Sequence, residues 1–88
     1  MADEALKKKI HDVLSQSYFK DQGDLVDVSN GSGDGIEVLV VSRKFDGQRL
    51  QAREDLICDA LVAALTPEEW GRITLTVAAS PEEIKAYG

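Results

Sequence analysis

The sequence predicts a single α+β domain in which a three-stranded mixed sheet carries its helices on one face, in the order helix, strand, strand, helix, short helix, strand. Three observations support this class. Apolar residues recur at helical spacing in residues 3–17 and 50–65. Two β-branched runs flank a glycine-rich turn at residues 30–35, and a third run at residues 73–77 alternates with threonine. A chain of 88 residues has room for one domain only, which we assign to residues 1–88.

The first helix is predicted over residues 3–17, because its apolar side chains fall on one stripe of an amphipathic helix. The stripe consists of Leu6, Ile10, Val13 and Leu14. Three lysines at positions 7–9 lie in the same helix beside acidic residues. We interpret them as a solvent-exposed face whose charges are largely balanced by their neighbours.

The runs at residues 25–29 and 36–42 predict an antiparallel hairpin. A helix follows over residues 50–65, with Leu50, Ile57, Leu61, Leu65, Ala60 and Ala64 on its buried side. Thr66, Pro67 and Glu69 have the spacing of an N-cap and capping box, so a short helical turn should begin there. Ser80 repeats this signature before a terminal turn. Because a helix separates the second and third strands, these two strands should be parallel.

Alternation in the third strand predicts one buried and one solvent-exposed face. We expect Ile73, Leu75 and Val77 to face the helices. The other sheet face should then be lined by Thr74, Thr76, Asp27 and Glu37. A sheet face or edge that no helix covers is available to a partner in a domain of this size.

Composition indicates a folded protein of a reducing compartment. Apolar residues make up 43% and charged residues 30% of the chain, far from a disordered composition. Cys58 is the one cysteine, so no intramolecular disulfide can form. The longest apolar run, residues 38–41, is too short for a bilayer, and no signal-peptide core precedes it. We expect a cytoplasmic protein, or an organelle matrix or stroma protein if a transit peptide has been removed, with no membrane partner.

Charge restricts the partners. The net charge of −6 repels phosphate backbones, so a nucleic-acid site would need local positive charge. Such a cluster exists, and it is our candidate partner- or nucleic-acid-binding site: Arg43, Lys44, Arg49 and Arg53. We expect these to be surface charges that contribute little to folding. The alternative is that they are solvated and pair with Asp46, Glu54 and Asp55. A competing contact site is the hairpin loop, with Ser32 and Asp34.

No catalytic or metal-binding constellation stands out. His11 and Cys58 are the only histidine and cysteine, and they lie on two different predicted helices at no metal-ligand spacing. We interpret His11 as a surface or half-buried residue and Cys58 as a small core residue. The glutamate pairs after Pro67 and Pro81 lie at helix starts, where negative charge favours the helix dipole. We therefore expect no enzyme, no catalytic residue and no metal ligand.

Residues 40–47, Val-Val-Ser-Arg-Lys-Phe-Asp-Gly, followed by Arg53 and an apolar helix at 56–61, resemble the BolA-like proteins. That family's signature is a strand ending before Phe-x-Gly and a helix carrying an Arg-His pair. Residues 73–75 and 80–83 resemble its His-Ala-Leu strand and Thr-Pro-x-Glu turn. The resemblance covers almost the whole chain and implies a topology similar to class II K-homology domains. It also predicts that Phe45 is buried against the helix and that Gly47 has a backbone unsuited to a β-carbon.

The family resemblance implies a monothiol glutaredoxin partner, with which BolA-like proteins can share a [2Fe–2S] cluster. Its ligands include a histidine on the third strand and a cysteine or histidine in the hairpin loop. Here Ile73 takes the strand position, Asp34 and Gly35 occupy the loop, and Glu54 replaces the histidine of the Arg-His pair. Isoleucine has no lone pair to donate, so we expect no cofactor in the isolated chain and doubt a shared cluster.

Two functions remain open from the sequence. One is a BolA-like adaptor that acts by protein–protein contact, with a glutaredoxin-like partner in iron–sulfur or redox homeostasis. The other is a nucleic-acid-binding transcriptional regulator that uses the cluster from Arg43 to Arg53. The net charge of −6 favours the adaptor. The oligomeric state stays open.

Overall fold

The computed structural model describes residues 3–87. Its elements are α1 (Glu4–Ser17), β1 (Leu25–Asn30), β2 (Ile36–Val41), the 3₁₀ turn η1 (Arg43–Phe45), α2 (Leu50–Ala64), α3 (Pro67–Trp70), β3 (Ile73–Ala79) and α4 (Pro81–Tyr87). This order confirms the α+β class, with α4 formed where the sequence predicted a terminal turn.

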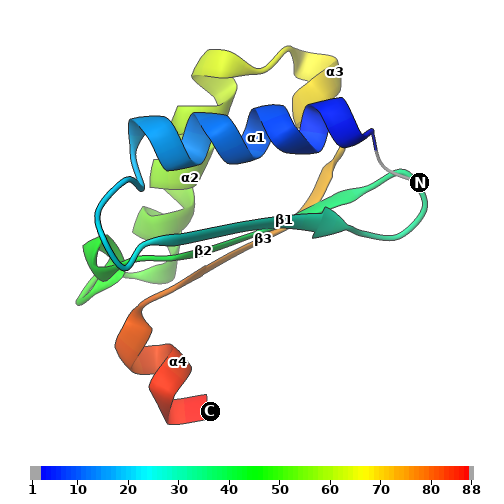
Figure 1. The fold of residues 1–88 in the computed structure, drawn as a ribbon. Helices are drawn as coiled ribbons and strands as arrows, with labels where there is room; N and C mark the ends of the chain where they lie inside the picture. The colour runs from blue at the N-terminus through cyan, green and yellow to red at the C-terminus, as the bar shows by residue number, and fades with distance from the viewer. Residues whose placement is uncertain (1–2, 88) are drawn as a thin grey trace.

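The sheet has the strand order β1-β2-β3, with β1 antiparallel and β3 parallel to β2. The mixed sheet predicted from the sequence is therefore confirmed. Figure 1 shows α1 and α2 on the same face of this sheet, while α4 leads away from the end of β3. Within residues 3–87, no helix combines the length and the apolar character that a bilayer crossing needs.

Local sequence signals set the helix boundaries. Asp3 caps α1 by accepting a hydrogen bond from the backbone N–H of Ala5 at 2.9 Å. At α3, the Thr66 hydroxyl accepts from the N–H of Glu69, and the Glu69 carboxylate accepts from the N–H of Thr66. The predicted capping box is thus present. The three lysines of α1 are each paired, with Lys7–Glu4 at 2.9 Å, Lys8–Asp12 at 2.7 Å and Lys9–Glu69 at 2.9 Å.

Phe45 and Gly47 lie as the family resemblance predicts. The Phe45 side chain is fully buried in the core, and its ring centre lies 5.5 Å from that of Phe19. Gly47 has a φ of 72°, a left-handed conformation that disfavours any residue with a β-carbon. The 3₁₀ turn between β2 and α2 therefore needs an apolar anchor followed by a glycine.

The buried side of α2 is shorter than its periodicity predicts. Leu50 is 62% exposed and Ala64 is also exposed, whereas Ile57, Ala60, Leu61 and Leu65 are buried as predicted. Arg53 occupies the position one turn before Ile57 on the same stripe, and it is buried together with Ile57, Ala60 and Leu61. The core-facing stripe of α2 therefore includes a charged residue that the sequence assigned to the surface.

The orientation predicted for β3 is wrong from Leu75 onward. Leu75 and Val77 are 49% and 41% exposed, whereas Ala78 is 6% exposed and Thr76 is half-buried. In the register with β2, Thr76 lies beside buried Val38, on the helix side of the sheet. Leu75 and Val77 thus lie on the face that no helix covers.

A bulge in β3 is the physical reason. Ile73 pairs with Ile36 and Leu75 pairs with Glu37, so Thr74 is an extra residue opposite a continuous β2. One extra residue moves all the side chains that follow to the opposite face. The Thr74 hydroxyl donates to the carbonyl of Ile36 at 3.3 Å, which holds the bulge in place.

Candidate functional site

The four residues of the predicted basic cluster occupy neighbouring elements. Arg43 and Lys44 lie on η1, Arg49 is the N-cap residue of α2, and Arg53 lies one turn into α2. These elements follow each other at the end of the sheet from which α4 departs (Figure 1). The structure brings the cluster together in space but gives its members different environments.

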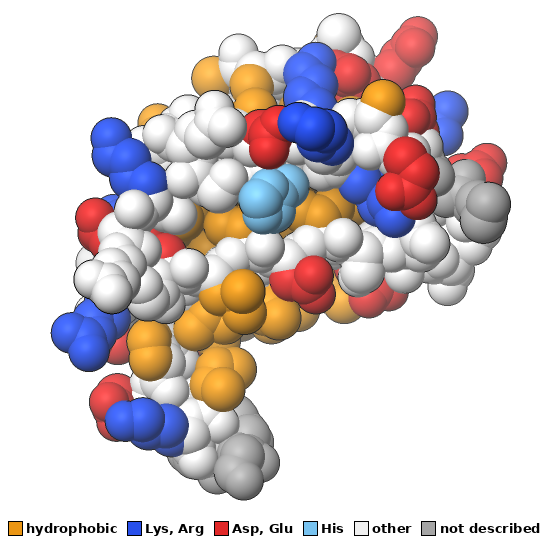
Figure 2. Space-filling view, in the orientation of Figure 1, with side chains coloured by type: hydrophobic (Ala, Val, Ile, Leu, Met, Phe, Trp, Pro, Cys, Tyr) orange, Lys and Arg blue, Asp and Glu red, His pale blue; other side chains and the backbone are white. Residues whose placement is uncertain are grey.

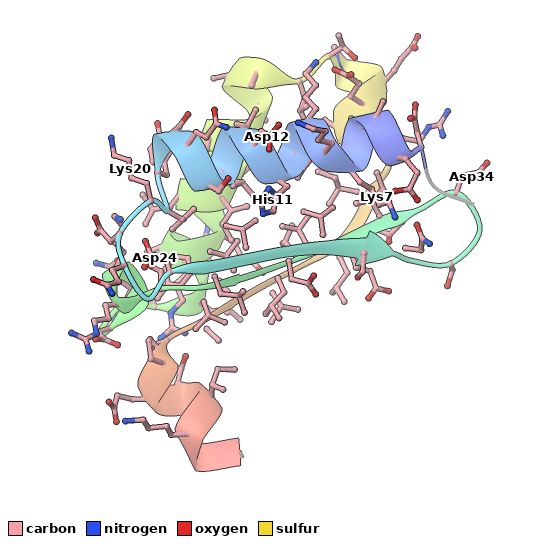
Figure 3. The ribbon with its side chains drawn as sticks, in the orientation of Figure 1. Lys7, His11, Asp12, Lys20, Asp24 and Asp34 are labelled. Carbon is pink, nitrogen blue, oxygen red and sulfur yellow. The ribbon has the colours of Figure 1, made fainter. Side chains whose placement is uncertain are left out.

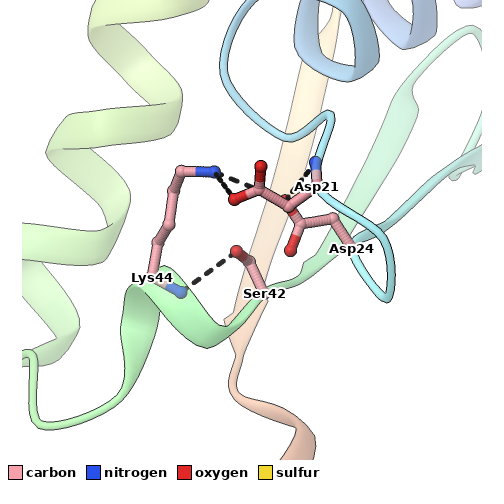
Figure 4. A network of polar contacts seen from close by, with 4 residues as sticks. All are labelled: Asp21, Asp24, Ser42 and Lys44. Atoms are coloured by element: carbon pink, nitrogen blue, oxygen red, sulfur yellow. Dashed lines mark hydrogen bonds and ion pairs between the residues drawn. The ribbon is translucent and has the colours of Figure 1, made fainter.

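Lys44 is neutralised within the chain. Its Nζ lies 3.0 Å from a carboxylate oxygen of Asp21 and 3.4 Å from one of Asp24, whose side chain is 4% exposed (Figure 4). The hydrogen bond from Lys44 to Asp21 is the main reason that the pKa of Lys44 is raised, and the charge of Asp24 adds to it. The backbone N–H of Lys44 also donates to the hydroxyl of Ser42 at 3.1 Å. This lysine therefore anchors the loop between α1 and β1 to η1.

Arg53 is a buried link between three elements. Its Nε donates to the carbonyl of Gln48 at 3.0 Å, and its Nη1 donates to the carbonyl of Ala78 at 3.3 Å. The same Nη1 lies 2.5 Å from a carboxylate oxygen of Glu83. This hydrogen bond, followed by one from the backbone N–H of Ser80, lowers the pKa of Glu83 to about 2. Arg53 thus joins α2 to the end of β3 and the first turn of α4, and it is no rim charge.

Arg43 and Arg49 remain. Both are exposed, and neither forms an ion pair within the described part of the chain. The acidic partners found for the other two cluster residues are Asp21, Asp24 and Glu83, in place of the predicted Asp46, Glu54 and Asp55. A predicted patch of four positive side chains therefore presents to solvent two that form no ion pair with any residue of 3–87.

The hairpin loop lies at the other end of the sheet. Figure 3 shows Asp34 at the tip of this loop and Asp24 near the opposite end of β1. Ser32 and Asp34 are exposed, and the loop is closed by a hydrogen bond from the N–H of Gly31 to the carbonyl of Gly35 at 2.8 Å. The two predicted contact sites therefore do not form one surface, and their roles in binding stay predictions.

A third surface, which the sequence assigned to polar residues, is largely apolar. We call it the open sheet face and define it by the side chains on the side of the sheet away from α1 and α2. Its three cross-strand rows are Leu25–Val41–Ala79, Asp27–Leu39–Val77 and Ser29–Glu37–Leu75. Figure 2 shows apolar side chains gathered along the underside of the sheet, with acidic side chains among them. Ile84 of α4, which is 45% exposed, lies beyond the end of β3.

His11 and Cys58 lie on different helices, α1 and α2. His11 is exposed on α1, with Nδ1 3.4 Å from a carboxylate oxygen of Asp12 (Figure 3), as expected for a surface histidine. Cys58 is half-buried rather than part of the core. It lines a cleft of about 210 Å³ with Glu54, Asp55, Trp70 and Thr76.

The residues at the family's ligand positions do not fit an iron–sulfur cluster. Ile73 is half-buried and packs against the core, and an alkyl side chain cannot donate to iron. The hairpin loop offers Ser32 and Asp34 but neither cysteine nor histidine. Across residues 3–87, no three side chains of His, Cys, Asp or Glu are grouped so that they could hold a metal ion.

Comparison with solved structures identifies the fold. The chain is similar to BolA1 from Mus musculus, with 22% sequence identity, coverage of 97% of this chain and 72% of the other, and a TM-score of 0.73. It is similar to a bol-like protein from Babesia bovis, with 26% identity, coverage of 92% and 91%, and a TM-score of 0.61. BolA1 from Arabidopsis thaliana has 17% identity, coverage of 92% and 98%, and a TM-score of 0.61. No family model and no curated protein matches the chain.

The fold and the surfaces define a small α+β domain with helices on one face of a three-stranded sheet and an apolar face left open. The matched structures confirm the resemblance that residues 40–47 predicted. This chain has the fold of the BolA-like proteins.

Proposed function

We propose that this BolA-like domain is an adaptor that acts by binding another protein and that it is not an enzyme. The observation that carries the proposal is the difference between its two kinds of surface. Two of the four residues of the basic cluster, Lys44 and Arg53, make their contacts inside the chain, whereas Leu25, Leu75 and Val77 are left in water. Exposed apolar side chains that lie together mark protein interaction sites, because water leaves them when a partner binds.

The partner class that the BolA-like fold favours is a monothiol glutaredoxin, in a cytoplasmic or organellar setting of iron–sulfur or redox homeostasis. The position of Ile73 argues that this chain adds no strand ligand to a shared cluster. Any cluster in the complex would then be ligated by the partner. The chain would contribute the docking surface.

Binding of a nucleic acid is the competing function. Arg43 and Arg49 alone, on a chain of net charge −6, give little positive field for a phosphate backbone. A regulator that used them would show affinity that falls steeply with salt, because each phosphate contact releases counterions.

The test is a direct binding measurement with a purified monothiol glutaredoxin and, in parallel, with single-stranded and double-stranded oligonucleotides, each at low and high salt. The proposal expects a one-to-one complex with glutaredoxin that survives high salt, since apolar contacts are insensitive to screening. Tight, salt-sensitive retention of an oligonucleotide without any glutaredoxin binding would contradict it.

A further inference from the structure

The open sheet face exposes apolar side chains that a monomeric domain has no structural reason to leave in water. Leu25, Leu75 and Val77 are 51%, 49% and 41% exposed, on two different strands. Leu39 lies between them on β2, paired with Val77 on one side and Asp27 on the other. A sheet is stable when each apolar face is covered by another layer, and here α1 and α2 cover only one face.

The same face carries negative charge and no positive charge. Asp27 and Glu37 lie on neighbouring strands as diagonal neighbours, because Asp27 pairs with Leu39 and Glu37 pairs with Ser29. Side chains in this relation lie about 7–8 Å apart. Neither carboxylate forms an ion pair within residues 3–87, and none of the nine positions in the three rows is Lys or Arg.

We propose that the open sheet face binds an amphipathic helix of a protein partner, whose apolar stripe covers Leu39, Leu75 and Val77 and whose Lys or Arg side chains reach Asp27 and Glu37. The inference rests on the adaptor function proposed above and names its docking surface and the chemistry of its partner. Basic side chains are the complement of two unpaired carboxylates beside an apolar patch, and such complementarity selects partners and steers their approach.

A helix suits this face better than an added strand. β2 is hydrogen-bonded to a strand on each side, so the centre of the face offers side chains and no backbone groups. A helix of about 15 residues has the length of a seven-residue strand, roughly 23 Å. Helices already form the covering layer on the opposite face of the same sheet.

Neither a second copy of the chain nor α4 suits the face. Two open faces brought together would place four carboxylates in one apolar interface, between chains that each carry a net charge of −6. The hydrogen bond from Arg53 of α2 to Glu83 ties the first turn of α4 to the end of β3, and α4 then leads away from the sheet (Figure 1). Its apolar residue Ile84 is 45% exposed.

The probe is a synthetic helical peptide of about 15 residues with a leucine stripe bordered by lysines. Its binding to the ¹⁵N-labelled chain is followed by amide chemical shifts and by fluorescence anisotropy. The expected result is that shifts concentrate on residues of β1, β2 and β3 whose side chains lie on the open face. A matched peptide with glutamate in place of each lysine should bind at least about tenfold more weakly.

Two double variants, one charged and one apolar, test the two parts of the surface, and a third double variant is the control for the change of charge. The charge reversal Asp27→Lys with Glu37→Lys should weaken binding about tenfold, whereas Asp55→Lys with Asp59→Lys on α2 should leave it unchanged. The control makes the same change of net charge, with both residues exposed on the other side of the sheet. Leu75→Thr with Val77→Thr keeps strand propensity and should also weaken binding about tenfold or more.

The inference is overturned if the shifts map to α1 or α2, if the glutamate peptide binds equally well, or if the α2 control loses affinity to the same extent. Self-association that the Leu75→Thr, Val77→Thr variant abolishes would assign the face to a second copy and overturn it as well. Glutaredoxin binding that all four substitutions on the face leave intact would support the adaptor function and refute this docking surface. Peptide binding that maps to the face without any glutaredoxin binding would support the surface and refute that partner.

Discussion

Arg53 should be essential for stability even though it lies in the basic cluster predicted to bind partners. Its guanidinium bonds the carbonyls of Gln48 and Ala78 at 3.0 and 3.3 Å and pairs with Glu83. Replacement by methionine keeps most of the aliphatic stem and removes all three interactions. It leaves the carbonyl of Ala78 in a buried place without its charged donor.

The expected loss follows from the two carbonyl bonds. Hydrogen bonds that involve a charged group contribute about 1.5–3 kcal/mol each, and the longer bond to Ala78 shares its donor with Glu83, so about 3 kcal/mol is expected for Arg53→Met. For a domain of this size that corresponds to a fall in Tm of about 12–24 °C. The Tm of Arg53→Lys should lie between the Tm of the natural chain and that of Arg53→Met, because one ammonium cannot serve three separated acceptors.

Thermal and urea unfolding followed by circular dichroism measures this effect, and Arg49→Met is the matched control. Arg49 is exposed, lies one turn from Arg53 and has no ion pair among the described residues. Arg49→Met should change the free energy of unfolding by no more than a typical surface substitution does, which is within about ±0.5 kcal/mol. Equal Tm values for Arg53→Met and Arg49→Met would show that the buried guanidinium does not hold α4 and β3 together, and the reasoning would fail.

Three further predictions concern the core, the hairpin and pH. Phe45→Ala should cost about 3–5 kcal/mol in urea unfolding because its ring is fully buried, and an unchanged midpoint would place the ring at the surface. Gly35→Ala should destabilise by about 1–3 kcal/mol, since its Cβ would lie 2.6 Å from Cγ2 of Thr74; a Thr74→Ser background should recover part of that loss, and no recovery would locate the strain elsewhere. Glu83 has its pKa lowered from 4.5 to about 2, so its stabilising contribution is complete above about pH 4.5 and is lost as the pH falls through 2. The difference in Tm between the natural chain and Glu83→Gln should therefore shrink across that window, and a constant difference would argue against the ion pair.

Most of the architecture could be predicted from the sequence because local patterns encode it. The capping residues Asp3 and Thr66 mark helix starts through hydrogen bonds to amides two or three residues away, so their signature is visible in the sequence. Strand and helix periods likewise depend on neighbours only. The buried Phe45 and the positive φ of Gly47 followed from the family resemblance, and the structure confirms both.

The surfaces were predicted less well because they depend on distant contacts. Lys44 meets Asp21 and Asp24, which precede it by 23 and 20 residues, and no local pattern signals that encounter. Arg53 was assigned to the surface by its charge, although its position four residues before Ile57 placed it on the buried stripe of α2. The helical spacing from Arg53 to Ile57 was the signal that Arg53 is buried, but the charge of the side chain decided the prediction that it lies at the surface.

The bulge at Thr74 decides which side chains the domain offers to a partner. Without the extra residue, Leu75 and Val77 would follow Ile73 onto the helix side, where burial of each would stabilise the fold by about 1.5–3 kcal/mol. The bulge instead puts the smaller Thr76 and Ala78 on the helix side, next to Val38 and Val40, where they occupy less space than Leu75 and Val77 would. The hydroxyl of Thr74 holds this arrangement through the carbonyl of Ile36. The bulge therefore leaves Leu75 and Val77, which are 49% and 41% exposed, on the open sheet face, where the proposed bound helix would supply the layer that covers them.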